Sequence, residues 1–321
     1  MIDGLGRGID YLRISVTDRC DLRCIYCMPE AGVAHLDHSE VLSYEEILRL
    51  AGIFASLGIR KIRLTGGEPL VRKDLFGLLA GLKATPGIDT VVLTTNGMLL
   101  EQQLPQLAAA GLDGVNISLD TLDEETFNSI TRRSGAGKVL SSIDAALTYP
   151  GMVVKLNCVP TRMNQEQLVP LCRFAAQRGI PLRFIELMPI GEGGCVSGLS
   201  EQETWDTLEA RLGALTPMIG ADPGDKCRYF TTPEGGRIGF ISAVSHKFCG
   251  NCNRIRLTAD GFLKTCLQYD QGAALKPLLG ESDDTIREVI ASTIGAKPSG
   301  HHFGIGAASG DETRKMSQIG G

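Results

Sequence analysis

The chain has 321 residues, 43% of them hydrophobic and 21% charged, and a formal net charge of −5. This composition suits a globular protein with one large domain and an appendage, and it gives no overall basic field for nucleic acid or an anionic membrane. With no apolar run of about 18 residues and no apolar leader in residues 1–7, we expect no membrane partner. Ten cysteines without an export signal favour a reducing compartment, so we expect a cytoplasmic location.

Strand-like runs alternate with helical patterns over residues 11–187. The predicted strands are Tyr11–Val16, Lys61–Thr65, Thr90–Thr95, Gly114–Leu119, Met152–Val159 and Leu182–Leu187. The predicted helices between and after them include Tyr44–Leu57, Leu75–Leu82, Gln102–Ala110, Val139–Tyr149 and Gln165–Arg178. This α/β alternation predicts parallel βα units, and six of them make an open, partial (βα)6 barrel, two units short of a TIM barrel.

The pattern changes after the sixth strand. We place a boundary near residue 220, with the barrel in residues 1–220 and a C-terminal segment in 221–321. That segment contains two predicted hairpins, Arg228–Phe230 with Arg237–Ser242 and Ile255–Ala259 with Phe262–Leu267, followed by a helix at Thr285–Ile294. The glycine pair at the end of the chain predicts a frayed tail.

Three cysteines follow the first predicted strand with the spacing CxxxCxxC: Cys20, Cys24 and Cys27. Three thiolates this close can hold three corners of a 4Fe–4S cube and leave its fourth iron open to a ligand. Two alternatives remain at this point. One is a structural zinc ion with His35 or His38 as fourth ligand, and the other is a disulfide.

Several predicted strands alternate between polar and apolar residues, although parallel strands covered on both faces are usually apolar throughout. One face of the sheet therefore carries the cations Arg13, Lys61, Arg63 and Lys155. Buried cations need partners, so this face predicts an anionic ligand. The alternative is an internal network with Asp120 and Glu186. Polar turns, such as Thr65–Pro69 and Thr94–Gly97, follow the strands, where βα barrels place their catalytic groups.

A second group of cysteines lies in the C-terminal segment: Cys249, Cys252 and Cys266. The dipeptide Asp260-Gly261 predicts a two-residue turn with Ala259 opposite Phe262, which places Cys266 opposite Ile255 and near Cys252. Three thiolates again favour an open cluster, and the alternative is a zinc site completed by His246. Arg254 and Arg256 alternate on one strand, either as phosphate donors or as a solvated face.

The CxxxCxxC loop with Tyr26 before its third cysteine resembles the signature of radical S-adenosylmethionine (SAM) enzymes, in which the open iron chelates SAM. The full order of motifs resembles the GTP 3′,8-cyclase family of molybdenum-cofactor biosynthesis. These motifs are this loop, Thr65–Pro69, Thr94–Gly97, Ser118–Asp120, CxxC-x13-C with Arg-x-Arg, Lys297-Pro with His301-His302-Phe303, and a final Gly-Gly. The resemblance covers essentially the whole chain and implies a partial (βα)6 barrel of the radical SAM type, closed by a segment with a second 4Fe–4S cluster.

The resemblance also assigns roles to residues. Cys20, Cys24 and Cys27 would hold the SAM cluster, and Cys249, Cys252 and Cys266 the second one. The SAM-contacting positions are Tyr26, Gly67, Ser118 and Met188. The GTP-contacting positions are Arg13, Arg63, Thr94, Lys155, Arg254, Ile255 and Arg256, with Lys61 and Arg183 nearby. Arg254, Arg256 and the tail residues Gly320 and Gly321 would act in catalysis, so the family implies a tail that enters the site.

The implied reaction starts from reductive cleavage of SAM to a 5′-deoxyadenosyl radical. The radical removes the 3′ hydrogen of GTP, and the ribose carbon joins C8 of guanine to give 3′,8-cyclo-7,8-dihydro-GTP. The implied partners are GTP, a reductant such as flavodoxin or ferredoxin, and the downstream cyclic pyranopterin monophosphate synthase, with the chain as a monomer or homodimer. Two alternatives are a radical SAM enzyme that modifies a peptide and a non-enzymatic zinc or electron-transfer module.

Overall fold

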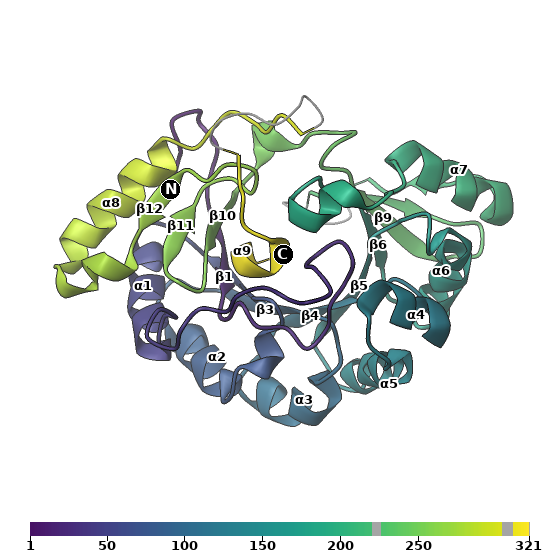
Figure 1. Cartoon of the computed structure of the whole chain (residues 1–321), viewed down its shortest axis with the longest axis horizontal. Helices are drawn as coiled ribbons and strands as arrows, with labels where there is room; N and C mark the ends of the chain where they lie inside the picture. Colours follow the sequence, from purple (N-terminus) through teal and green to yellow (C-terminus); the bar gives the residue numbers. More distant parts are fainter. Residues whose placement is uncertain (220–225, 304–310, 321) are drawn as a thin grey trace.

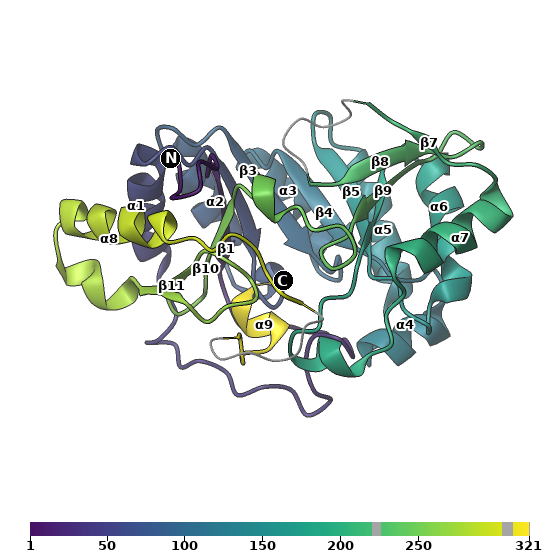
Figure 2. The same cartoon turned by 90° about the horizontal axis from the view of Figure 1, so that it is seen from above.

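The computed structural model describes residues 1–219, 226–303 and 311–320. Its described residues form one sheet with the strand order β12-β11-β10-β1-β2-β3-β4-β5-β6-β9-β8-β7. The sheet curves, and most helices lie on its outer side (Figure 1). Seen from above, β11 lies towards one end of this curve and β7 towards the other (Figure 2). No helix among the described residues is long and apolar enough to cross a membrane.

The six predicted βα strands are confirmed, with small shifts at their ends. They are β1 (Tyr11–Ser15), β2 (Lys61–Thr65), β3 (Thr90–Thr95), β4 (Gly114–Ser118), β5 (Val153–Cys158) and β6 (Leu182–Ile185). All neighbouring pairs among them are parallel. The helices that follow these strands are α1 (Tyr44–Ser56), α2 (Leu75–Ala84), α3 (Leu100–Ala109), α4 (Glu124–Thr131), α5 (Ala136–Leu147), α6 (Leu168–Gln177) and α7 (Glu201–Leu212).

Local sequence explains where these helices begin. Ser43 accepts a hydrogen bond from the Glu46 amide, and the Glu46 side chain accepts one from the Ser43 amide, so a capping box starts α1. Ser200 and Glu203 form the same box at the start of α7. The apolar faces of the helices pack on the apolar residues of the strands, such as the fully buried Leu12, and together they form the main core.

The C-terminal segment extends the same sheet on both sides. Strand β9 (Arg237–Ile241) pairs in parallel with β6, and β10 (Arg254–Leu257) pairs in parallel with β1. Further strands of this segment, β8 (Arg228–Thr231), β11 (Phe262–Lys264) and β12 (Gly272–Ala274), pair antiparallel. The edge strand β7 (Thr216–Pro217) precedes the segment and pairs antiparallel with β8. The partial barrel is thus completed by strands from beyond residue 220, and the division there remains a prediction.

The register predicted for the β10–β11 hairpin is wrong by one residue. Arg256 lies opposite Lys264 and Leu257 opposite Leu263, so Cys266 continues the ladder opposite Arg254, not Ile255. The turn has three residues because Thr258 Oγ1 accepts a hydrogen bond from the Phe262 amide (3.0 Å) and donates one to Asp260. Gly261 has φ of 78°, as expected in a three-residue loop with a left-handed last residue.

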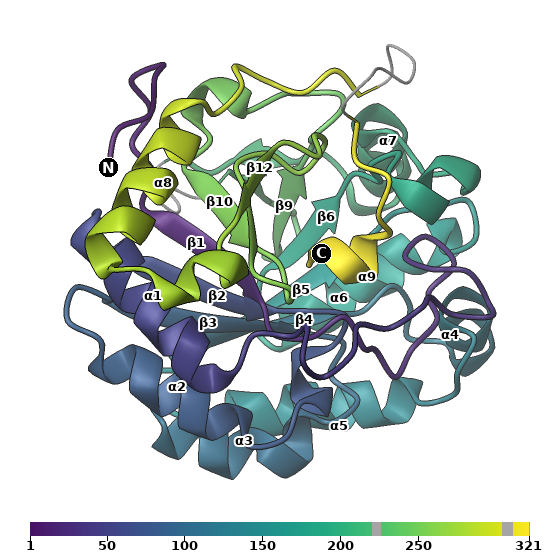
Figure 3. The ribbon, with the colours of Figure 1, turned by 60° about the vertical axis from the view of Figure 1, so that its left-hand side comes forward.

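The last described residues lie in the mouth of the barrel. Helix α8 (Asp283–Gly295) lies beside the N-terminal segment, and α9 (Met316–Ile319) lies in front of the sheet near its centre (Figure 3). Ile319 is buried with Ile190 and Phe303 in a small second core. The frayed tail expected from the glycine pair is wrong for residues 311–320, because this core and a buried ion pair order them.

Candidate active site

The first cysteine triad lies in the loop after β1. Cys20, Cys24 and Cys27 are half-buried free thiols, held by a turn in which the Cys27 amide donates to the Cys24 carbonyl (2.9 Å). Burial raises the pKa of Cys24, and the charges of Cys27 and Cys20 raise it further. The three sulfurs therefore lie close enough to repel one another as thiolates. A bound cationic cluster is the kind of group that would stabilise them in that form.

Neither cysteine triad, as the structure describes it, forms the donor set of a single zinc ion. Among the described residues, no three His, Cys, Asp or Glu side chains converge on a point that one metal ion could occupy. Two of the three histidines proposed as zinc ligands have other neighbours. His35 Nδ1 lies 3.5 Å from Asp18 Oδ2, and His246 Nδ1 lies 3.1 Å from Glu201 Oε2. A cube that spans three separated thiolates is consistent with this donor set.

The turn Thr65–Pro69 is pressed against the cysteine loop, and this contact explains its two glycines. A Cβ on Gly66 would lie 2.7 Å from the Thr17 carbonyl oxygen, and one on Gly67 would lie 2.4 Å from that of Arg19. The Glu68 amide donates to the Arg19 oxygen (2.8 Å). Only glycine lets the two backbones approach this closely. The turn therefore fixes the position of Cys20.

Glu68 links this turn to the end of β3. Its buried carboxylate accepts hydrogen bonds from the Leu70 amide (3.0 Å), the Thr95 hydroxyl (2.7 Å) and the Asn96 amide (2.7 Å). Burial nevertheless raises the pKa of Glu68 to about 7. Asn96 also donates to Asp21 Oδ1 (2.7 Å), next to Cys20. The ends of β2 and β3 are thus tied to the first triad.

The end of β4 completes this side of the site. The Tyr26 hydroxyl donates to Asp120 Oδ2 at 2.5 Å, and the Val159 amide donates to Asp120 Oδ1 at 2.8 Å. Burial raises the pKa of Asp120 to about 6. A small cavity of about 30 Å³ lies here, and Cys24, Tyr26 and Ser118 are among its lining residues. Two of the predicted SAM-contacting residues therefore share a cavity with a cysteine of the first triad.

A cationic cluster lies on the inner face of β1, β2 and β10, which we call the lumen. Arg13 pairs in register with Arg63 on one side and with Arg256 on the other. Arg63 is buried, and it donates to the Thr94 hydroxyl at 2.8 Å and to the Tyr11 hydroxyl. Burial lowers the pKa of Arg13, and the charge of Arg256 lowers it further. Such mutual repulsion is offset when an anion binds between the guanidinium groups.

Tyr11 belongs to this cluster, although the sequence analysis did not single it out. Burial alone would raise its pKa, but the guanidinium groups of Arg63, Arg13 and Arg254 lower it to about 8. The Lys61 ammonium lies 5.2 Å from the centre of its ring. The period of two that placed Arg13 and Ser15 on one face also places Tyr11 there, and this signal could have found it.

The far side of the lumen carries the remaining cations. Lys155 lies opposite Asn116 on β4, and its ammonium lies 6.0 Å from the centre of the Tyr229 ring. Arg183 is buried and donates twice to Asn157 Oδ1, at 3.0 and 2.6 Å. Asp120 and Glu186 were the alternative partners of these cations. Asp120 accepts from Tyr26 and Val159, and Glu186 accepts from the amides of Val244 and Ser245 at 2.7 and 2.8 Å.

The second triad lies at the start of β10 and beyond β11. Cys249 opens a short 3-10 turn (Cys249–Asn251), Cys252 follows it, and Cys266 comes two residues after β11. The charges of Cys266 and Cys252 both raise the pKa of Arg256, although burial lowers it overall to about 10. These two cysteines thus lie close to the lumen arginines. The side chain of Ile255 is fully buried opposite Leu12, so it faces the core and only its main chain can reach a ligand.

The end of the chain meets this cluster. Arg256 donates a hydrogen bond to the Gly320 carbonyl oxygen. Gly320 has φ of 76°, and a Cβ there would lie 2.9 Å from Thr65 Oγ1 and 3.0 Å from Ser15 Cβ. The tail therefore lies against the ends of β1 and β2. Met188 packs at the edge of the small core with Ile319. Gly321 lies outside the described residues.

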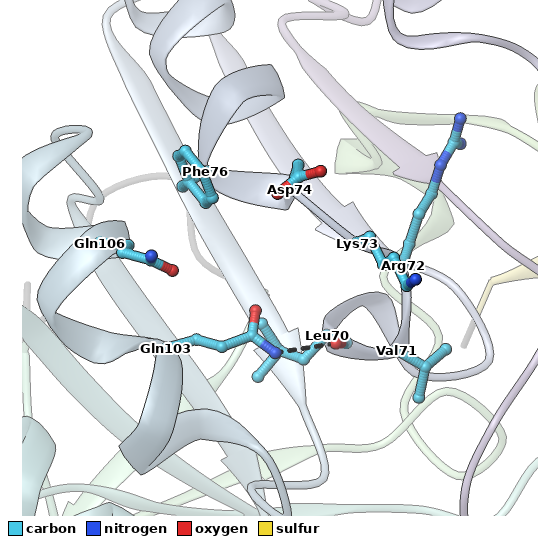
Figure 4. A pocket seen from close by; sticks show the side chains of 8 residues that line it. All are labelled: Leu70, Val71, Arg72, Lys73, Asp74, Phe76, Gln103 and Gln106. Carbon is cyan, nitrogen blue, oxygen red and sulfur yellow. Dashed lines mark hydrogen bonds between the residues drawn. The ribbon is translucent and has the colours of Figure 1, made fainter.

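A separate cavity of about 290 Å³ lies between the start of α2 and α3 and is lined by none of the predicted site residues (Figure 4). Gln103 crosses it to donate to the Leu70 carbonyl oxygen at 2.9 Å. It has Lys73 and Asp74 at its rim but no cysteine.

Comparison with known proteins identifies the class that this barrel and cysteine loop define. Residues 14–175 match the model of the radical SAM superfamily, and residues 180–303 match a family described as Molybdenum Cofactor Synthesis C. The chain resembles the structure of Streptococcus suis SuiB bound to S-adenosylmethionine, with a TM-score of 0.59 and 17% identity over 90% of this chain and 68% of that one. It also resembles native anSMEcpe with bound AdoMet, with a TM-score of 0.52 and 19% identity over 62% and 59%. These likenesses support the fold.

Sequence relatives are more specific. The GTP 3′,8-cyclase of Heliobacterium modesticaldum is 47% identical over the full length of both chains. The GTP 3′,8-cyclase of Desulforamulus reducens is 43% identical over the full length of both chains. That of Caulobacter vibrioides is 44% identical over all of this chain and 94% of its own. The chain belongs to the GTP 3′,8-cyclase family within the radical SAM superfamily. Membership of the superfamily implies SAM and a 4Fe–4S cluster, and the predicted fold class is confirmed.

Proposed function

We propose that this chain is a GTP 3′,8-cyclase that joins the 3′ carbon of the GTP ribose to C8 of guanine, the first step of molybdenum-cofactor biosynthesis. The observation that carries the proposal is the cationic lumen between two cysteine triads. Full-length relatives with this name support the reaction over peptide modification and over a zinc or electron-transfer module. The fold likeness to SuiB, at 17% identity, does not extend to its substrate.

We assign the first triad to the SAM cluster. Cys20, Cys24 and Cys27 hold three irons, and the fixed turn at Gly67 positions the loop that carries them. Tyr26, Gly67, Ser118 and Met188 contact SAM. Tyr26 is already oriented by Asp120, and Ser118 lines the same cavity. When bound there, this cluster and SAM would supply the radical chemistry that removes the 3′ hydrogen of the ribose.

We assign the lumen to GTP. Arg13, Arg63, Lys155 and the run Arg254–Arg256 receive the nucleotide, and Thr94 is held beside Arg63. Guanidinium groups give bidentate contacts to phosphate, so they fix the triphosphate and thereby the sugar. The short tail helix α9 helps to cover the mouth (Figure 1), and exclusion of water protects a radical from side reactions. Arg254, Arg256, Gly320 and Gly321 act at the reacting end.

We assign a second 4Fe–4S cluster, which Cys249, Cys252 and Cys266 would hold by three of its irons. Its support is the donor set and its place beside Arg256. We further propose a cytoplasmic location, since all ten cysteines are free thiols. The reductant is a flavodoxin or ferredoxin, the product passes to cyclic pyranopterin monophosphate synthase, and the chain acts as a monomer or homodimer.

Anaerobic incubation of the reconstituted chain with SAM, GTP and dithionite tests the reaction. We expect 5′-deoxyadenosine and a cyclised guanine nucleotide in equal amounts. A triple variant with alanine at Cys20, Cys24 and Cys27 is the matched control and should give neither product. Formation of 5′-deoxyadenosine without a GTP-derived product would contradict the proposed substrate.

A further inference from the structure

The segment 297–300, which follows α8, packs directly on the second cysteine triad. A Cβ on Gly300 would lie 3.3 Å from Cβ and 3.5 Å from Sγ of Cys249. The buried Lys297 ammonium donates to the carbonyl oxygens of Arg254 (2.9 Å) and Thr265, the residue before Cys266. The segment therefore contacts the parts of the chain that carry all three cysteines.

The N-terminal segment holds this loop in place, and it runs beside α8 (Figure 3). Arg7 is buried, and its guanidinium donates to the carbonyl oxygens of Cys249 (3.0 Å), Lys297 (3.2 Å) and Pro298 (2.8 Å). Asp3 orients Arg7 through a 2.6 Å ion pair. One rigid frame thus places two buried cations, Arg7 and Lys297, beside the second triad.

The two triads differ in their charged neighbours, although a cation also lies beside the first one, where Arg23 donates to the Cys20 carbonyl oxygen (2.7 Å). In the part of the chain that the structure describes, Lys297 forms hydrogen bonds to two carbonyl oxygens and no ion pair with a carboxylate. The negative charges that act on it come from Cys252 and Cys266, and to a smaller extent from Asp3, which is paired with Arg7. Carboxylates lie near the first triad. Besides burial, the charges of Glu68 and Asp21 raise the pKa of Cys20, and the charge of Asp120 raises the pKa of Cys24 and of Cys27.

We propose that Lys297, held by Arg7, is a positioning residue that raises the reduction potential of the second cluster above that of the first. The inference rests on the proposed second cluster. One-electron reduction adds one negative charge to a cluster, so a nearby buried cation stabilises the reduced form and nearby carboxylates destabilise it. Electrons from the reductant then reside first on the centre that faces the substrate.

The test measures each cluster separately in the full-length chain. Variants with alanine at the three cysteines of one triad retain only the other cluster, and each is titrated anaerobically with dithionite while EPR follows the reduced cluster. In the chain that retains the second triad, Lys297→Gln keeps a donor for the carbonyls but loses the charge, and Lys297→Arg keeps the charge. We expect Lys297→Gln to lower the equilibrium constant for reduction about tenfold, a shift of about 59 mV for one electron, and Lys297→Arg to change it little.

Two results would overturn the inference. One is an unchanged potential in Lys297→Gln. The other needs no Lys297 variant: a second-cluster potential at or below that of the first cluster. Either outcome leaves the proposed second cluster intact. Failure of the chain that retains the second triad to bind iron and sulfide would overturn the second cluster and this inference together.

Discussion

The tail is anchored by a buried ion pair, and removing one partner should release it. Lys264 is fully buried on β11, and its ammonium contacts the Glu312 carboxylate and the Tyr269 carbonyl oxygen. Glu312 is also nearly fully buried, and Arg314 donates to it from Nε and Nη2 at 3.0 Å each. Residues 311–320 lead from this pair to Gly320, so the ion pair and the small second core around Ile319 together hold the tail in the lumen.

We predict that Lys264→Met makes docking of the tail less favourable by about 3 kcal/mol. Breaking a buried pair costs roughly 3–5 kcal/mol because it leaves one charge buried without its partner, and the contacts from Arg314 put this case at the low end. A loss of about 3 kcal/mol corresponds to a roughly hundredfold increase in the fraction of molecules whose tail is undocked. Hydrogen exchange of the amides in 311–320 should accelerate by that factor, and the interior strands should keep their protection.

Two further variants test the reasoning. Lys83→Met removes a half-exposed pair with Asp113 and should leave exchange in the tail unchanged, since such pairs contribute about 0–1 kcal/mol. Lys264→Met combined with Glu312→Met removes both charges and should recover much of the protection. Two outcomes would contradict the role of the ion pair. One is tail amides of Lys264→Met that exchange at the wild-type rate, and the other is a double variant whose tail amides exchange faster than those of the single variant.

Three further predictions concern the site itself. Gly67→Ala places a Cβ against the Arg19 carbonyl oxygen, so we expect this variant to lose SAM binding, measured by equilibrium dialysis, and iron from the first cluster, measured by iron analysis. Gly77→Ala is the control and should retain both, because no atom lies within 4 Å of the Cβ that it adds. Arg256→Ala or Lys155→Ala should weaken GTP binding by roughly ten- to hundredfold in calorimetry, because a charge-assisted hydrogen bond contributes about 1.5–3 kcal/mol. The iron content of both variants should be unchanged. A loss of iron would assign Arg256 and Lys155 a structural role. Tyr11 should ionise near pH 8 in the GTP-free chain, seen as a phenolate absorbance step that Tyr11→Phe removes. Its pKa is depressed on folding, so Tyr11 should stabilise the fold increasingly as pH rises from 8 towards 10; a single step near pH 10 would contradict the cationic lumen.

The features that the sequence predicted correctly depend on residues that lie close together in the chain. The six parallel strands follow from alternating strand and helix patterns, and the lumen cations follow from a period of two within β1 and β2. The pairing of β9 with β6 and of β10 with β1 was not predicted, because it joins strands that lie far apart in the chain. The β10–β11 register was wrong because Thr258 bonds across the turn and adds one residue to it. The order of the tail depends on Lys264, 48 residues from Glu312, and composition alone carries no signal of that contact.

In the proposed site, the lumen holds the GTP ribose next to the SAM cluster. Incubation with GTP deuterated at the 3′ carbon, followed by mass spectrometry of the 5′-deoxyadenosine, tests it most directly. We expect one deuterium in that product for each cyclised nucleotide formed. Unlabelled 5′-deoxyadenosine alongside the cyclised nucleotide would contradict it.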